Sequence, residues 1–219
     1  MRLSEIRKVG ILKTIYYNFK FCRFIDAIHF PLIVARNVDL RGNRKSLVFN
    51  DLIRWGGVTI GFNRDYNSGA PSSFSIYDKM VFIGKGNHSF GAGCSILVKK
   101  GAVLEIGNHF GCTGDSRIWV HKKVVIGENN LWSFGCTVLD GDGHKILDAE
   151  GERINNDSQV IFGDNVWLGC NCTVLKGSII PSSCIIASES LITRCEIEGE
   201  GVIITTGGRV LKKGINWRQ

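Results

Sequence analysis

The chain has 219 residues, 44% of them hydrophobic and 21% charged, which is enough for one well-buried core and ordinary for a soluble globular domain. Its 27 Lys and Arg against 20 Asp and Glu give a formal net charge of +7, which suits phosphates or a membrane surface. The sequence has no base-stacking aromatic motif, zinc-finger spacing or helix-turn-helix pattern, so we expect no nucleic-acid partner.

The first predicted element is an amphipathic helix, which with its connector takes residues 1–35. Its apolar stripe consists of Ile11, Ile15, Phe19, Cys22 and Ile25, and Pro31 marks the stop. We favour a helix packed against the main body or a neighbouring subunit. The alternative is an interfacial helix at a membrane, because basic residues flank its aromatic residues. These are Arg2, Arg7, Lys8, Lys13, Lys20 and Arg23. The segment predicts neither a signal peptide nor a membrane span.

A six-residue period dominates the rest of the chain. A bulky apolar residue returns every sixth position, at Phe162, Leu168, Val174, Ile180, Ile186 and Ile192. Three places later, residues that tolerate the left-handed backbone region follow at Asn165, Asn171 and Gly177. The same offset from Cys112, Ile126 and Trp132 gives Asp115, Asn129 and Gly135. A period of six fits neither a helix nor one strand, so it predicts a parallel β-helix whose triangular coils each contain three such units.

The register continues upstream through Ile60-Gly61, Ile83-Gly84, Ile106-Gly107 and Ile126-Gly127. Four of the eight cysteines fall two places before a bulky position, at Cys94, Cys136, Cys172 and Cys184. Small apolar residues at one place in a repeat are core fillers, so we expect reduced, buried thiols. We assign the β-helix to residues 36–198, with an irregular loop at 139–158, and a basic cap or short helix to 199–219.

The stretch "IFGDNVWLGCNCTVLKGSII", preceded by "DGDGHKILDAEGERIN", resembles hexapeptide-repeat acyltransferases, and in particular those that O-acetylate bacterial surface polysaccharides. The resemblance covers about residues 60–217. It implies a left-handed parallel β-helix, a homotrimer with active sites between subunits, and acetyl-coenzyme A as donor without a metal. It also implies a sugar or glycan acceptor and a cytoplasmic location, at the inner face of the membrane if the helix binds there.

The resemblance also implies roles for single residues. His144 is expected to be the general base, since a neutral imidazole can take the acceptor's hydroxyl proton. Asp142 is expected to orient that imidazole. The residues expected at the donor are Trp167, Gly169, Lys176, Ser188, Thr193 and Arg194.

The sequence departs from the family pattern at Pro181 and Glu189, where small residues are usual, and this bears on donor choice. Two alternatives therefore stay open: N-acetylation of an amino sugar, and a non-catalytic β-helix that serves as a scaffold or binding subunit. The sequence identifies neither the sugar nor the acetylated group.

Overall fold

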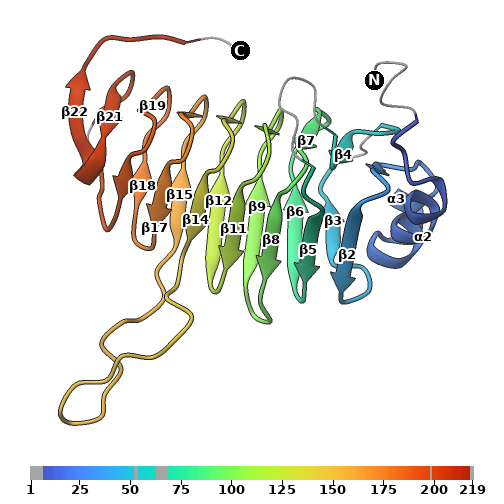
Figure 1. The fold of residues 1–219 in the computed structure, drawn as a ribbon, viewed down its shortest axis with the longest axis horizontal. Coiled ribbons are helices and arrows are strands. Elements are labelled where there is room, and N and C mark those ends of the chain that lie inside the picture. The colour runs from blue at the N-terminus through green and yellow to red at the C-terminus, as the bar shows by residue number, and fades with distance from the viewer. Residues whose placement is uncertain (1–6, 52–53, 63–68, 198, 218–219) are drawn as a thin grey trace.

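The strands of the chain form three sheets that run side by side along the molecule (Figure 1). The computed structural model describes residues 7–51, 54–62, 69–197 and 199–217. Successive strands enter the three sheets in rotation, so that three strands make one triangular coil and each strand pairs in parallel with the strand one coil away. The predicted left-handed parallel β-helix with an N-terminal helix is confirmed.

The strand bounds follow this rotation. The nine-stranded sheet contains β1 (Leu32–Val34), β4 (Val58–Ile60), β7 (His88–Phe90), β10 (Gly111–Cys112), β13 (Leu131–Trp132), β16 (Trp167–Leu168), β19 (Ile185–Ile186), β21 (Ile203–Thr205) and β22 (Arg209–Lys212). The seven-stranded sheet contains β2 (Val38–Gly42), β5 (Ser72–Ile76), β8 (Ser95–Val98), β11 (Arg117–Val120), β14 (Thr137–Leu139), β17 (Thr173–Leu175) and β20 (Leu191–Ile192). The six-stranded sheet contains β3 (Leu47–Phe49), β6 (Lys79–Phe82), β9 (Val103–Ile106), β12 (Lys123–Ile126), β15 (Val160–Phe162) and β18 (Ile179–Ile180).

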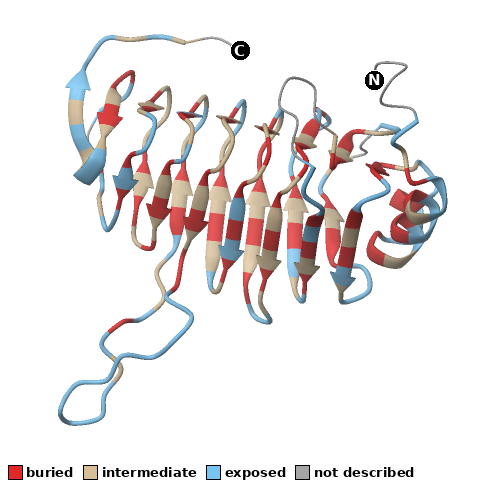
Figure 2. Cartoon of the chain, viewed as in Figure 1, coloured by how far each residue is buried: buried red, intermediate tan, exposed pale blue. Residues whose placement is uncertain are grey.

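The bulky hexad residues fill the interior of the triangle, as Figure 2 shows by the buried positions along each strand. All six residues of the period from Phe162 to Ile192 are at most 1% exposed. At about 25 cal/mol per Å² of apolar surface, each such side chain contributes roughly 1.5–3 kcal/mol of burial free energy. The interior column of hexads is therefore the main source of stability.

The predicted corners adopt the left-handed conformation that the hexad register requires. Positive φ angles occur at Asp115, Asn129, Gly135, Asn165, Asn171 and Gly177, as expected. The same conformation continues at Ser183 and Glu189, both with φ of 60°. Neither side chain favours this region, so each corner carries a backbone cost of about 1–2 kcal/mol.

Two details of the predicted register are wrong. Phe82, not Ile83, fills the core of β6, where it pairs with Ile106 on β9; Ile83 is 36% exposed. The β-helix also begins earlier than residue 36, since β1 starts at Leu32 and pairs in parallel with β4. The repeat has extra residues between its early coils, and this irregularity hides its first turn from a periodicity argument.

The four cysteines of the hexad register occupy the interior, as predicted. Cys94, Cys136, Cys172 and Cys184 are all fully buried. The first three precede β8, β14 and β17 of the seven-stranded sheet, where Ser72, Ser116 and Ser190 stand at the equivalent place in other coils. This position therefore holds serine or cysteine in successive coils, because the bulky hexad residues leave little room for a larger side chain. All eight thiols are free.

The N-terminal helices cover the first coil. Helix α2 (Ile11–Phe21) packs against β1, and α3 (Phe24–Ala27) follows directly. The predicted stripe does not face the core: Ile11, Ile15, Phe19 and Ile25 are exposed, and only Cys22 is buried. The inward face consists of Thr14, Tyr17, Asn18 and Phe21. No helix among the described residues is long and apolar enough to cross a membrane.

The other end closes with a reversal of strand direction. β22 pairs antiparallel with β21, whereas the strand pairs before it are parallel. A single 3-10 turn at Thr206–Gly208 connects them, so part of the expected cap or short helix is a strand.

One buried histidine makes the fold sensitive to acid. His88 on β7 is 1% exposed, its ring centroid lies 5.0 Å from that of Phe82, and neither ring nitrogen has a hydrogen-bond partner in the described chain. Burial, aided by the nearby His109, lowers the pKa of His88 to about 4. The native state thus holds His88 neutral, whereas the unfolded chain protonates it below about pH 6.5.

We therefore predict that the free energy of unfolding falls by about 3 kcal/mol between pH 7 and pH 4 through His88 alone. Above pH 6.5 both states are neutral and the term vanishes. His88→Leu should remove this part of the pH dependence in denaturant titrations at several pH values. His29→Gln, at an exposed histidine, is the matched control. Equal acid sensitivity in wild type and His88→Leu would contradict the assignment.

Candidate active site

The loop between β14 and β15 projects from the β-helix as a long arm (Figure 1). Its first residue ties it to the preceding coil. The Asp140 carboxylate is fully buried and accepts hydrogen bonds from the backbone N–H groups of His121 (2.6 Å), Lys122 (2.8 Å) and Lys123 (2.6 Å). The Ser158 N–H donates to the Asp140 carbonyl at 2.9 Å, which joins the returning strand to the same point. Hydrogen bonds of Asp140 therefore fix both the point where the arm leaves the β-helix and the point where it returns.

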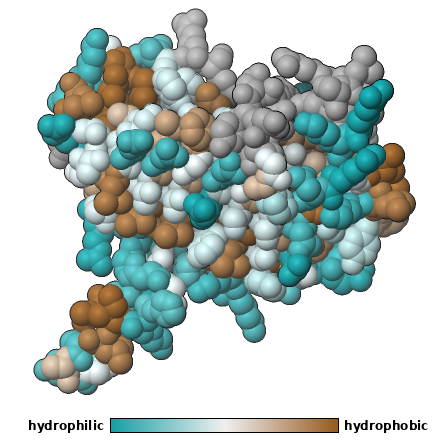
Figure 3. Space-filling model, in the orientation of Figure 1, coloured by the Kyte–Doolittle hydropathy of each residue, from teal (hydrophilic) through white to brown (hydrophobic). Residues whose placement is uncertain are grey.

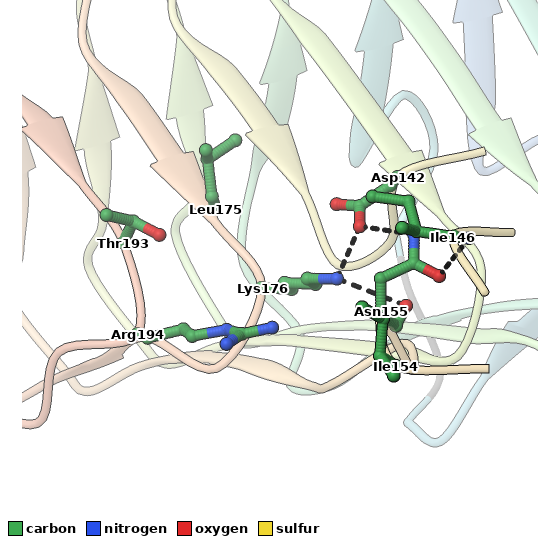
Figure 4. Close-up of a pocket in the computed structure, with 8 residues that line it drawn as sticks. All are labelled: Asp142, Ile146, Ile154, Asn155, Leu175, Lys176, Thr193 and Arg194. Atoms are coloured by element: carbon green, nitrogen blue, oxygen red, sulfur yellow. Dashed lines mark hydrogen bonds and ion pairs between the residues drawn. The ribbon is translucent and has the colours of Figure 1, made fainter. Parts of the chain in front are cut away.

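A second set of contacts fixes the arm beyond these two points. The Lys176 ammonium, just after β17, donates to Asp142 Oδ2 at 2.5 Å and to the Asn155 carbonyl at 3.2 Å (Figure 4). The Asn155 side chain donates to the same carboxylate oxygen at 2.7 Å. Lys176 is only 7% exposed, so its charge depends on these partners.

Asn155 also sets the backbone around His144. Its amide donates to the His144 carbonyl at 2.8 Å, and its side-chain oxygen accepts from the Ile146 N–H at 2.8 Å. The His144 residue is exposed, and its imidazole makes no hydrogen bond within the described chain. The structure thus fixes the backbone position of His144 and leaves its ring open to solvent.

The Asp142 carboxylate forms an ion pair with Lys176, a residue of the β-helix. The hydrogen bond from Lys176 holds the pKa of this carboxyl below its ordinary value, with further help from Asn155 and the charges of Lys176 and Arg194. In the described chain no hydrogen bond joins Asp142 to the His144 ring. The orienting role of Asp142 therefore stays a prediction, and its observed role is to anchor the loop.

A cleft of about 460 Å³ lies beside this anchor (Figure 4). It is lined by Asp142, Ile146, Ile154, Asn155, Leu175, Lys176, Thr193 and Arg194. The predicted residues Lys176, Thr193 and Arg194 are thus brought together with the loop that carries His144. The charged lining consists of Lys176, Arg194 and Asp142, which give a net charge of +1, and three apolar side chains accompany them. This lining suits a ligand with an anionic group and an apolar part.

The remaining predicted residues lie elsewhere on the chain. Trp167 belongs to β16 in the nine-stranded sheet, whereas Lys176 follows β17 in the seven-stranded sheet. The Trp167 indole is 37% exposed and donates to Ser133 Oγ at 3.3 Å. The Trp217 ring lies 6.0 Å from it. One chain therefore presents two separate groups of candidate residues.

Gly169 has a packing role at this second place. A Cβ atom there would come within 2.6 Å of the Ser188 nitrogen in the next coil, so the close approach requires glycine. The Gly169 N–H donates to the Ile186 carbonyl at 2.8 Å and the Trp167 N–H to the Cys184 carbonyl at 2.9 Å. Both N–H groups are therefore occupied by hydrogen bonds of the sheet.

Sequence reasoning missed Asn155 as a site residue. Its position at the end of "DGDGHKILDAEGERIN" was a signal, because that motif carries the family resemblance, but spacing could not reveal which loop atoms it contacts. Among the described residues, no group of three or more His, Cys, Asp or Glu side chains could hold a metal ion.

Comparisons with known proteins agree on one class of enzyme. No family model matches the chain. The polysialic acid O-acetyltransferase of Neisseria meningitidis is 30% identical over 146 residues, which are 66% of this chain and 52% of that protein. The UDP-3-O-acylglucosamine N-acyltransferase of Hydrogenovibrio crunogenus (strain DSM 25203 / XCL-2) is 33% identical over 79 residues, 33% of this chain and 22% of that protein. The chain thus spans about half the length of the first relative and less of the second.

The fold has a counterpart among solved structures. The polySia-specific acetyltransferase NeuO shares it with a TM-score of 0.50 and 18% sequence identity, over 86% of this chain and 89% of that one.

Replacement of the anchoring lysine should release the arm. Lys176→Met removes charge-assisted hydrogen bonds worth about 1.5–3 kcal/mol, so we expect limited proteolysis within residues 140–159 to become at least about tenfold faster. Lys145→Met, at an exposed lysine in the same loop, should leave the cleavage rate unchanged. Equal cleavage rates for Lys176→Met and wild type would show that the ion pair does not anchor the loop.

Proposed function

We propose that the chain is an O-acetyltransferase of the hexapeptide-repeat acyltransferase family and that it moves the acetyl group of acetyl-coenzyme A to a sugar hydroxyl. The acceptor is a bacterial surface polysaccharide or its precursor. The observation that carries the proposal is the position of the arm: a long segment leaves the β-helix after β14, and Asp142 and Ile146, on either side of His144, line the cleft with Lys176 and Arg194.

His144 acts as the general base. As the sugar oxygen attacks the thioester carbonyl carbon, an imidazole nitrogen of His144 takes the hydroxyl proton. Collapse of the tetrahedral intermediate breaks the carbon–sulfur bond, and the thiolate of coenzyme A recovers a proton from the imidazolium. The solvent-open ring of His144 supports this role, since the acceptor can reach it without displacing a protein partner.

The cleft supplies a site for the anionic donor. Lys176 and Arg194 contribute positive charge, while Ile146, Ile154 and Leu175 offer apolar surface to the pantetheine arm. Glu189 is exposed in the turn after β19, near Ser188, where its charge would repel a phosphate. We infer that Lys176 and Arg194 outweigh this repulsion.

The acceptor is inferred from relatives. The name of the Neisseria relative specifies O-acetylation of polysialic acid, and the match covers 66% of this chain. The Hydrogenovibrio relative is an N-acyltransferase, and it supports transfer to the amine of an amino sugar as the second candidate. Both reactions need the same base. A non-catalytic scaffold accounts poorly for a buried lysine that anchors an irregular loop and also lines the cleft.

The working unit is a homotrimer in the cytoplasm. The two groups of candidate residues lie on different sheets, so one chain does not bring His144 and Trp167 together. Three large apolar side chains on the arm are more than half exposed, namely Ile146, Leu147 and Ile154. An adjacent subunit would cover them and complete the site. The free, buried thiols suit a reducing compartment.

We predict that His144→Ala lowers the turnover of acetyl transfer by about 10²–10⁴-fold, because the hydroxyl proton loses its acceptor. Calorimetric titration with acetyl-coenzyme A should give the same affinity for the variant and for wild type. Lys145→Ala is the matched control and should keep full turnover. Failure of wild type to bind millimolar donor would overturn the donor assignment, and full turnover in His144→Ala would overturn the base.

Co-expression of two inactive variants tests the shared site. Trp167→Ala is expected to lose activity like His144→Ala. If one subunit supplies His144 and its neighbour Trp167, random mixed trimers contain intact pairs at about a quarter of their sites, and activity returns to that level. If both residues serve the same chain, every site in the mixture carries one substitution and activity stays absent.

A further inference from the structure

The exposed positions of α2 are all apolar, and apolar side chains extend this outward face into the α3 region. In α2, the residues that point away from the β-helix are Ile11, Leu12, Ile15, Tyr16 and Phe19, and their exposed fractions run from 43% to 82%. The face continues through Phe24, Ile25 and Ile28 of the α3 region, with exposed fractions from 45% to 71%. Figure 3 shows hydrophobic surface at this end of the molecule. We call these eight residues the apolar helix face.

Hydrogen bonds to the first strand prevent this face from turning inward. The Asn18 side chain donates to the Leu32 carbonyl at 3.0 Å and accepts from the Leu32 N–H at 3.1 Å. Thr14 Oγ1 accepts from the Val34 N–H at 3.2 Å. These partners satisfy the open edge of β1, so rotation of the helix would leave buried backbone groups unpaired. The polar side of α2 is committed to the sheet, and its apolar side must face outward.

The segment around the face carries positive charge. Residues 7–31 contain five Lys and Arg and one Asp, which gives a net charge of +4 out of the chain's +7. Arg7 and Lys8 are exposed just before α2, and Lys20 lies 5.3 Å from the ring centroid of Tyr16 at the border of the face. An apolar face bordered by lysine and arginine complements a bilayer with anionic headgroups.

We propose that the apolar helix face binds the surface of an anionic phospholipid membrane, with the helix lying in the plane of the interface. A second copy of this chain is the less suitable occupant, since it would bring two segments of charge +4 together. The cleft lies at coils near the opposite end of the β-helix (Figure 1), so a membrane-bound molecule keeps it accessible. The enzyme would thereby be concentrated where membrane-linked glycans are assembled.

Flotation of the full-length chain with vesicles tests the proposal. Wild type should float with phosphatidylcholine vesicles that contain about 30% phosphatidylglycerol, and much less with pure phosphatidylcholine or in high salt. Leu12→Glu/Phe24→Glu, at side chains that are 82% and 71% exposed, should weaken the partition coefficient at least about tenfold. Arg7→Gln and Lys8→Gln should each weaken it about fivefold.

Leu211→Glu is the matched control, because Leu211 is 54% exposed on β22 at the other end of the molecule. It should float like wild type. Equal flotation of Leu12→Glu/Phe24→Glu and wild type, or no flotation of wild type, would overturn the proposal. So would a wild-type assembly that this double variant dissociates, because a second copy would then cover the face.

Acetyl transfer to a water-soluble acceptor separates this inference from the proposed function. Leu12→Glu/Phe24→Glu should retain wild-type transfer. If no protein transfers acetyl while flotation behaves as described, the enzymatic proposal fails and the membrane surface stands.

Discussion

The left-handed corner is the constraint on which the rest of the structure depends. A strand of two to five residues can pack its bulky side chain into the interior only if the chain turns sharply every sixth residue. Asn, Asp and Gly make that turn at little cost, and they occur at the required offset in the coils between Asp115 and Gly177. Each turn aligns the next hexad over the previous one, and the parallel hydrogen bonds follow from this alignment.

The candidate site lies where the hexad repeat is interrupted by the loop between β14 and β15. Asp140 joins both ends of the arm to the preceding coil, since its buried carboxylate accepts from the His121 N–H and its carbonyl accepts from the Ser158 N–H. Lys176 holds the arm against another coil. The β-helix thus contributes a rigid frame, and the loop carries His144, the imidazole that we propose as the general base. Lys176 has two roles, since it binds Asp142 and lines the cleft that we propose for the anionic donor.

Much of the fold could be predicted from the sequence, because the hexad period and the corner residues are local signals that agree with each other. The orientation of α2 could not, since its apolar stripe suggests an inward face while Thr14 and Asn18 are drawn to the unpaired edge of β1. The family resemblance selected Lys176, Thr193 and Arg194, which line one cleft. It gave no way to see that Asp142 is bonded to Lys176 and Asn155, because that contact joins segments 34 residues apart.

The structures at the two ends of the β-helix also bear on its association with other chains. A parallel β-helix could add coils indefinitely, and a bare terminal coil would act as a template for another chain. At one end, side chains of α2 occupy the backbone groups of β1; at the other, β22 reverses direction and pairs antiparallel with β21. Both devices lie in the nine-stranded sheet, where each takes the place of a further parallel strand. The features that finish this sheet therefore also disfavour the addition of another chain to it as a parallel strand.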